Sequence, residues 1–346
     1  MWLVTTMYVL ILLVVAMALT FDFVNGWNDS ANAIATVIAT RVLSPSSAVA
    51  LATLLNLAGA MVGVRVADTM SKILHTTPQF FEHPETVLVV IVAGLVSASI
   101  WAAAMTLLGM PISGSHSLIG GVVGAGVAAA GVKALVVKNI TSTLLAMLVA
   151  PAMGFFAAYF FYVLMIWMTR RVKPTTMNTS FGKAQILSAS WMAFTHGTND
   201  AQKVMGIITM ALVAGGYQTA PADGKFEVQF WVKIACAAAI SFGTAVGGWK
   251  VIKTLGHHLT KLGTPEGFAA ETSASLVLTM AAWLGVPTST THTITGSILG
   301  VGATRGMSSV RWGLGEKIIL AWVFTLPTTA AVGGAVYWVL HVTVGY

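Results

Sequence analysis

Two short segments with the same polar core are the most chemically informative part of this chain. Residues 25–32 read NGWNDSAN, and residues 196–203, which begin 171 positions later, read HGTNDAQK. Each segment places one aspartate, Asp29 or Asp200, inside a long apolar stretch. A carboxylate within a membrane costs about 3 kcal/mol or more, so such residues usually serve a function. The pair therefore predicts a duplicated chain whose halves share one polar site, as in many secondary transporters.

A second pair of motifs supports the duplication. Residues 111–116 read PISGSH and residues 287–292 read PTSTTH, and each motif begins 12 positions after a Ser-Ala-Ser triplet. A proline followed by hydroxyl residues and a new apolar helix is typical of a re-entrant helical hairpin in a membrane protein. The start of such a helix offers free N–H groups and the positive end of the helix dipole, which suit an anion.

The hydroxyl residues of these motifs are the expected anion-binding groups. We predict that a tetrahedral oxyanion is held without a fixed cationic side chain by the hydroxyls of these motifs, which are Ser113, Ser115, Thr288, Ser289, Thr290 and Thr291. The alternative is ordinary hydrogen bonding of hydroxyls to the backbone within a membrane helix. The occurrence of the motif in both halves favours the anion site.

The two aspartates are the expected binding site of a coupling ion. A carboxylate in a membrane interior either pairs with a cation or takes up a proton. Asn28, Asn32 and Asn199 add neutral oxygens, which a hard ion such as sodium accepts, so a sodium site at Asp29 and Asn32 stays open. The alternative is a structural carboxylate that caps a broken helix, and the two roles are compatible.

The two halves differ at positions that bear on the coupling ion. Lys203 occupies the position that corresponds to Asn32, and Glu271 occupies the position that corresponds to Leu95. An ammonium group cannot bind sodium, but Lys203 can neutralise Asp200 or an anion, or exchange a proton. A lysine that extends to the membrane surface is the alternative. We expect Glu271 to hold or relay the coupling ion, together with Asp29, Asn32 and Asp200.

A metal centre and an enzymatic function are disfavoured. His116 and His292 are paired across the halves, but one histidine in each half, without a His-Glu-x-x-His spacing, is a poor metal site. We expect each histidine to organise its hairpin. Asn56 is interpreted as an interhelical hydrogen-bonding residue rather than a wall of the site, and Cys236 as a packing residue.

The composition places the chain in a membrane. Hydrophobic residues make up 56% of it and charged residues 8%, with a mean hydropathy of +0.83. Soluble domains carry roughly 25% charged residues, so a water-facing surface is excluded. The net charge of +7 is concentrated in loops, where it indicates membrane orientation and not nucleic-acid binding. Residues 3–19 are expected to be a retained first helix and not a signal peptide.

The distribution of apolar and polar stretches predicts two transmembrane repeats. The most polar stretch, 169–183, carries four cations and no acid, so it is interpreted as a basic cytoplasmic linker between a first repeat at 1–168 and a second at 184–346. Longer apolar segments alternate with short, glycine-rich pieces near 26–40, 111–130, 199–215 and 287–304, which we expect to break from regular helix.

The charges of two corresponding loops indicate how the repeats are oriented. The loop at 65–85, which includes Glu82, has mixed charge, and the matching loop at 250–263 is basic. Under the positive-inside rule these two loops lie on opposite sides of the membrane. The fold class predicted is therefore an all-α polytopic membrane protein of two inverted-topology repeats, with broken helices and two re-entrant hairpins.

These motifs resemble those of the inorganic phosphate transporter (PiT) family, and in particular its bacterial low-affinity permeases. The family carries paired Gly-x-Asn-Asp-x-x-Asn-Ala signatures and paired Pro-x-Ser-x-[Thr/Ser]-His hairpins. Residues 26–33 match the first signature, and residues 111–116 and 287–292 match the hairpins, so the resemblance spans nearly the whole chain. It implies a protein of the cell membrane, commonly a homodimer, that moves phosphate with sodium or protons and has no cofactor.

The resemblance also implies roles for individual residues, and this chain departs from the family pattern at one place. It implies a cation at Asp29, Asn32 and Asp200, phosphate at the hairpin hydroxyls, and a family glutamate at Glu271. The second signature departs at Gln202-Lys203, which is similar to a bacterial branch associated with proton-coupled uptake. The sequence therefore favours a proton-driven phosphate symporter. Sodium coupling, cargo in the form of a metal–phosphate complex, a sulfate carrier on the same fold and, remotely, a membrane metalloenzyme remain as alternatives.

Overall fold

The chain folds as a bundle of helices in the computed structural model, which describes residues 2–75, 83–219 and 225–344. Glu82, one of the charged residues in the loop at 65–85, lies outside the described residues. The helices of the first half are α1 Trp2–Ala39, α2 Pro45–Ala60, α3 Arg65–Met70, α4 Pro84–Leu108, α5 Gly114–Ala130 and α6 Val137–Thr169. Those of the second half are α7 Pro174–Ala214, α8 Phe230–Val246, α9 Trp249–Lys253, α10 Thr264–Trp283, α11 Thr290–Ala303 and α12 Trp312–Val344. The all-α prediction is confirmed.

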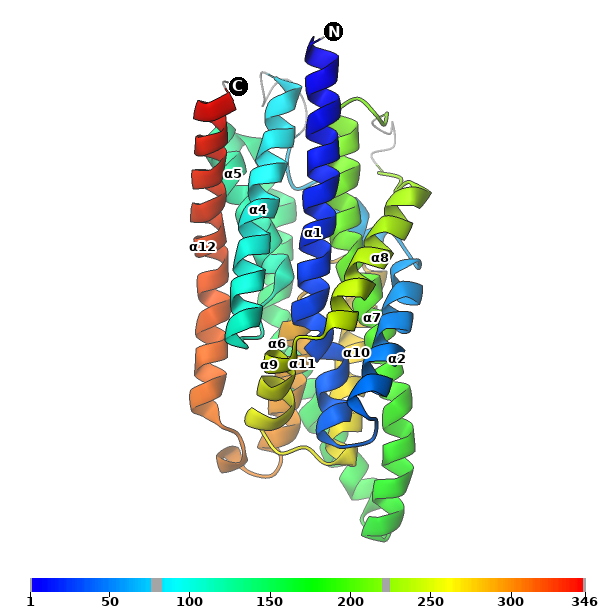
Figure 1. The fold of residues 1–346 in the computed structure, drawn as a ribbon. Helices are drawn as coiled ribbons and strands as arrows, with labels where there is room; N and C mark the ends of the chain where they lie inside the picture. The colour runs from blue at the N-terminus through cyan, green and yellow to red at the C-terminus, as the bar shows by residue number, and fades with distance from the viewer. Residues whose placement is uncertain (1, 76–82, 220–224, 345–346) are drawn as a thin grey trace.

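The order of elements in the first half recurs in the second. A short 3₁₀ turn precedes α6 at Val132–Ala134 and α12 at Met307–Ser309. Isolated bridges join Leu74 to Leu135 in one half and Thr260 to Val310 in the other. Figure 1 shows α1 running from the top of the view to the bottom and its counterpart α7 running from bottom to top. A duplicated chain predicts this recurrence.

Several helices have the length and composition of membrane spans. Among the described residues, four helical segments meet this test, and α8 with α9, bent by 63°, makes a fifth if the pair is one span. Large apolar side chains cover the outside of the bundle, such as Leu148 and Leu187, which are 75% and 74% exposed. Lipid tails can cover such a surface, and helices satisfy their own backbone groups within it.

The two polar signatures lie within continuous helices, which corrects one prediction. The pieces at 26–40 and 199–215 were expected to break from regular helix, but α1 continues to Ala39 and α7 continues to Ala214. The glycines there serve close packing instead. A Cβ atom on Gly26 would lie 2.2 Å from the carbonyl oxygen of Ile240, and one on Gly197 would lie 2.2 Å from that of Asn56. The broken helix in the described residues is the bend between α8 and α9.

The two halves interlock through these contacts. Gly26 belongs to α1 and packs on α8 of the other half, whereas Gly197 belongs to α7 and packs on α2. The hairpin helix α5 likewise packs on α12, and α11 packs on α6. The predicted linker at 169–183 contains the last residue of α6 and the first turns of α7, so only residues 170–173 lie outside helices. Interlocking brings α1, α7 and α11 together at the centre.

Candidate functional site

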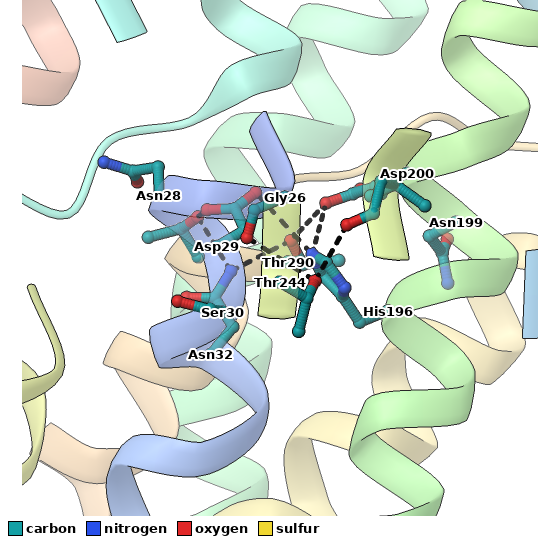
Figure 2. A network of polar contacts seen from close by, with 12 residues as sticks. Gly26, Asn28, Asp29, Ser30, Asn32, His196, Asn199, Asp200, Thr244 and Thr290 are labelled. Atoms are coloured by element: carbon teal, nitrogen blue, oxygen red, sulfur yellow. Dashed lines mark hydrogen bonds and ion pairs between the residues drawn. The ribbon is translucent and has the colours of Figure 1, made fainter. Parts of the chain in front are cut away.

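Two aspartates and a histidine meet where α1 and α7 face each other. His196 Nε2 lies 3.1 Å from Asp200 Oδ2 and 3.9 Å from Asp29 Oδ2. One polar atom from each residue falls within 4.8 Å of the others, and all three side chains are buried. Figure 2 shows Asp29 on α1 and His196 and Asp200 on α7 directed toward one another. The structure therefore brings together the acids that the sequence placed 171 positions apart.

His196 received no role from the sequence. Its spacing from Asp200 was the available signal, because residues four apart on a helix share a face. Its ring is held by Asn56, whose Oδ1 lies 3.0 Å from His196 Nδ1 and whose Nδ2 donates to Thr244 at 2.8 Å. Asn56 thus links α2, α7 and α8 as predicted, but it also forms the wall behind His196.

The hydroxyls at the start of α11 bind the two aspartates. Thr291 Oγ1 donates to Asp29 Oδ1 at 2.7 Å, and Thr290 Oγ1 donates to Asp200 Oδ2 at 2.9 Å. The amide of Asn32 donates to both hydroxyls, at 3.2 and 3.1 Å. Two of the predicted anion-binding hydroxyls therefore form hydrogen bonds with the predicted ion-binding carboxylates.

Three other predicted hydroxyls form hydrogen bonds with the backbone near the starts of α5 and α11. Ser113 and Ser289 cap α5 and α11, because each accepts a hydrogen bond at 3.2 Å from the backbone N–H of His116 or His292. Ser115 donates to the carbonyl oxygen of Thr288 at 3.3 Å. The local hydrogen bonding considered as an alternative therefore accounts for the present contacts of Ser113 and Ser289.

Lys203 is buried and joins this cluster. Its ammonium pairs with Asp200 Oδ1 and donates to the carbonyl oxygen of Thr288 at 2.7 Å. The side chain is 4% exposed, so the alternative of a lysine that extends to the membrane surface is wrong. With His196 neutral, the ionised forms of Asp29, Asp200 and Lys203 leave one negative charge, which a proton on the histidine or a bound cation can balance.

Glu271 forms a separate acidic site. Its carboxylate accepts hydrogen bonds from Thr36 on α1, from Ser188 at 2.5 Å and from Gln185 at 3.2 Å, both on α7. Thr36 follows Asp29 by seven residues, which is two helical turns. Glu271, on α10, therefore contacts the same face of α1 that carries Asp29, but two helical turns further along. It is not a direct partner of the Asp29 cluster.

The amides of the two predicted modulating asparagines turn to neighbouring helices. Asn28 donates to Thr106 at 2.8 Å, and Asn199 donates to the carbonyl oxygens of Thr195 and Leu278 at 2.9 and 3.3 Å. Figure 2 shows both side chains at the outer edges of the network. These contacts use the amide nitrogens, whereas the Oδ1 atoms of Asn28 and Asn199 are buried and have no hydrogen-bond partner among the described residues. Their addition of oxygens to a cation site stays a prediction.

The hairpin histidines lie against each other behind the hydroxyl tips. The rings of His116 and His292 are 4.6 Å apart, and His292 stacks on Trp322 at 3.8 Å. Trp322 in turn donates to the carbonyl oxygen of Pro111 at 2.9 Å. The histidines thus connect the two hairpins with α12, which agrees with an organising role. The described residues that fit a metal are instead Asp29, His196 and Asp200.

Comparison with known proteins gives one consistent result. The model of the phosphate transporter family matches residues 25–333. A probable low-affinity inorganic phosphate transporter of Rhizobium meliloti (strain 1021) is 42% identical, with 96% of this chain and 97% of the relative covered. A transporter of the same description from Bacillus subtilis (strain 168) is 39% identical, with 96% and 98% covered.

A solved structure shares the fold. The structure titled "The sodium-dependent phosphate transporter" superposes with a TM-score of 0.87 and covers 97% of this chain and 100% of that one. Its sequence is 24% identical, so the likeness bears on the fold alone.

Proposed function

Because the chain belongs to the phosphate transporter family, we propose that it is a proton-driven symporter that carries inorganic phosphate across the cell membrane by alternating access. The observation that supports this most is the contact between the hydroxyls of Thr290 and Thr291 and the carboxylates of Asp200 and Asp29. Groups suited to an anion and groups suited to a proton are thus in direct contact. It is a transporter and not an enzyme.

This contact suggests how the two substrates are coupled. An ionised carboxylate accepts hydrogen bonds strongly, so it holds the hydroxyls of Thr290 and Thr291. Protonation of Asp29 or Asp200 weakens that hold and frees the hydroxyls to donate to phosphate. Ser113, Ser115 and Ser289, at the starts of the hairpin helices, add donors and the positive ends of two helix dipoles. Proton binding thus prepares the anion site.

Lys203 favours the proton as the coupling ion. Its ammonium pairs with Asp200 Oδ1, so this oxygen already has a positive partner, which lowers the need for a metal cation at Asp200. Sodium is the second candidate, since Asn32 Oδ1 is buried without a partner among the described residues and lies on the same helix as Asp29.

The proposal includes an orientation and an assembly. The halves 1–168 and 184–346 form an inverted repeat, which the opposite directions of α1 and α7 support (Figure 1). The basic stretch 169–183 lies in the cytoplasm, because positive loops favour that side. Rocking of the interlocked helices then exposes the central site to each side in turn. The homodimer implied by the family resemblance is retained as part of the proposal.

Uptake of radiolabelled phosphate into proteoliposomes tests the substrate. We expect excess unlabelled phosphate to suppress uptake and excess sulfate to leave it nearly unchanged, because sulfate carries no proton to donate to Asp29. Equal competition by sulfate would show a broader oxyanion carrier. Repeating the assay with a metal chelator distinguishes free phosphate from a metal–phosphate complex, since only the complex requires a divalent metal.

A further inference from the structure

Asp22 is a buried carboxylate to which the central site gives no role. It lies on α1, is 0% exposed, and neither of its oxygens has an N–H or O–H partner among the described residues. Its counterpart in the second half, 171 positions later, is Ala193. An ionised carboxylate in such surroundings is strongly disfavoured without a partner. The group is therefore suited to carry a proton.

The helices packed against Asp22 supply little to hold a charge. On α8, the thiol of Cys236 faces it as a weak donor. On α7, the charged groups that act on it are Asp200, His196 and Lys203 of the central site. Residues 86–108 of α4 and 45–60 of α2 contain no titratable side chain. Asp22 thus interacts electrostatically with the central site and has no countercharge of its own.

The position of Asp22 along α1 connects it with the other acids. Asp22 precedes Asp29 by seven residues, and Asp29 precedes Thr36, the partner of Glu271, by seven more. Two helical turns separate each pair, so all three positions share one face of α1, at intervals of about 10 Å. Asn25 lies between Asp22 and Asp29, and its buried Oδ1 has no partner among the described residues. Polar groups therefore follow this face from Asp22 to Glu271.

We propose that Asp22 is a further proton-binding site of the transport cycle, the first of three acidic groups that follow one face of α1, with Asp29 on α1 and Glu271 on α10. The inference rests on the proposed proton coupling. In this arrangement Asp22 exchanges its proton with the Asp29 cluster by way of Asn25 and bound water. Each cycle then moves one proton through Asp22, in addition to any proton carried at Asp29 and Asp200.

The proton-to-phosphate ratio tests this proposal. In sodium-free proteoliposomes with a clamped membrane potential, the phosphate gradient at zero net flux reports that ratio. Removing one transported proton lowers the phosphate accumulation by about tenfold for each unit of imposed pH difference, because one pH unit is a tenfold change in proton activity. We expect Asp22→Asn to show this loss, Asp22→Glu to restore it, and Cys236→Ala to match the wild type.

Phosphate exchange at equal pH, which needs no net proton movement, shows whether each variant is folded. An unchanged ratio in Asp22→Asn would overturn the proposal and make Asp22 a permanently protonated packing residue. Loss of exchange in Asp22→Asn, or a lowered ratio in Asp22→Glu, would also overturn it, because exchange at equal pH needs no proton transfer at Asp22 and glutamate keeps the carboxyl group. If the wild type does not respond to a pH difference at all, proton coupling itself fails, and this inference with it.

Discussion

At the residue scale, Lys203 is a position at which the two halves differ in charge. Its ammonium pairs with Asp200, whereas the corresponding Asn32 donates neutral hydrogen bonds to Thr290 and Thr291. Asp200 therefore has a fixed countercharge in Lys203, whereas the cationic partner available to Asp29 is His196, 3.9 Å away, which is charged only when it is protonated. This asymmetry makes the charge balance at Asp29 depend on a proton or a cation from solution.

Replacement of Lys203 by methionine is expected to slow proton-driven uptake. The change removes the fixed cation but keeps the apolar stem, so Asp200 is left buried with only the titratable His196 beside it, at a cost of about 3–5 kcal/mol. We expect at least tenfold slower uptake, measured as the initial rate of phosphate entry, and a lower melting temperature. Lys203→Arg, which keeps the charge, is the matched control. Full activity of Lys203→Met would show that Asp200 needs no fixed partner.

The hydroxyl of Thr291 is expected to contribute to phosphate affinity. Thr291→Val keeps the shape of the side chain and removes the donor to Asp29, whereas Thr291→Ser keeps the donor. Loss of a hydrogen bond to a charged group costs about 1.5–3 kcal/mol, which corresponds to a rise in KM of roughly tenfold or more. The concentration dependence of uptake measures this change. Equal KM values for the valine and serine variants would remove Thr291 from the anion site.

Many of the residues in the central site were predictable from the sequence, but their contacts were not. Asp29 and Asp200 were recognised because their motif recurs, and Lys203 because it breaks the recurrence. His196 and Asp22 do not recur, since their counterparts are Asn25 and Ala193, so the comparison of halves did not select them. Which hydroxyl binds which carboxylate depends on packing between α11 and α1 or α7, which local sequence does not specify.

At the element scale, two glycine contacts decide how closely the central helices approach. Gly26 lies against α8 and Gly197 against α2, each with a backbone carbonyl at 2.2 Å from where a Cβ atom would stand. The prediction that 26–40 and 199–215 break from helix failed for this reason. Glycine weakens a helix by local propensity, but here tertiary packing of its bare face stabilises a continuous one.

A methyl group at Gly197 is therefore expected to separate α7 from α2. Gly197→Ala places its Cβ atom against the carbonyl oxygen of Asn56, the residue that holds His196. Overpacking of this kind costs about 1–3 kcal/mol, so we expect a lower melting temperature and slower uptake. The matched control is Gly315→Ala on α12, where a Cβ atom would meet nothing within 4 Å. Equal melting temperatures for the two variants would contradict the packing argument.

At the scale of the whole molecule, the halves interlock instead of lying side by side. Each half contributes its first helix to a pair with the other half, α1 with α8 and α7 with α2, and its hairpin helix to a pair with the other half's last helix. The recurrence of motifs predicted two halves and one shared polar site. It did not predict the exchange of partners, because contacts between distant segments leave no periodic signal in a single sequence.

In the proposed cycle a proton, and not sodium, drives phosphate through the site formed by Asp29, His196 and Asp200. The most direct measurement is the uptake of radiolabelled phosphate into proteoliposomes under separately imposed proton and sodium gradients, at fixed membrane potential. We expect accumulation with an inward proton gradient in sodium-free buffer and none with a sodium gradient at equal pH. Accumulation driven by sodium alone, or by neither ion, would contradict this proposal.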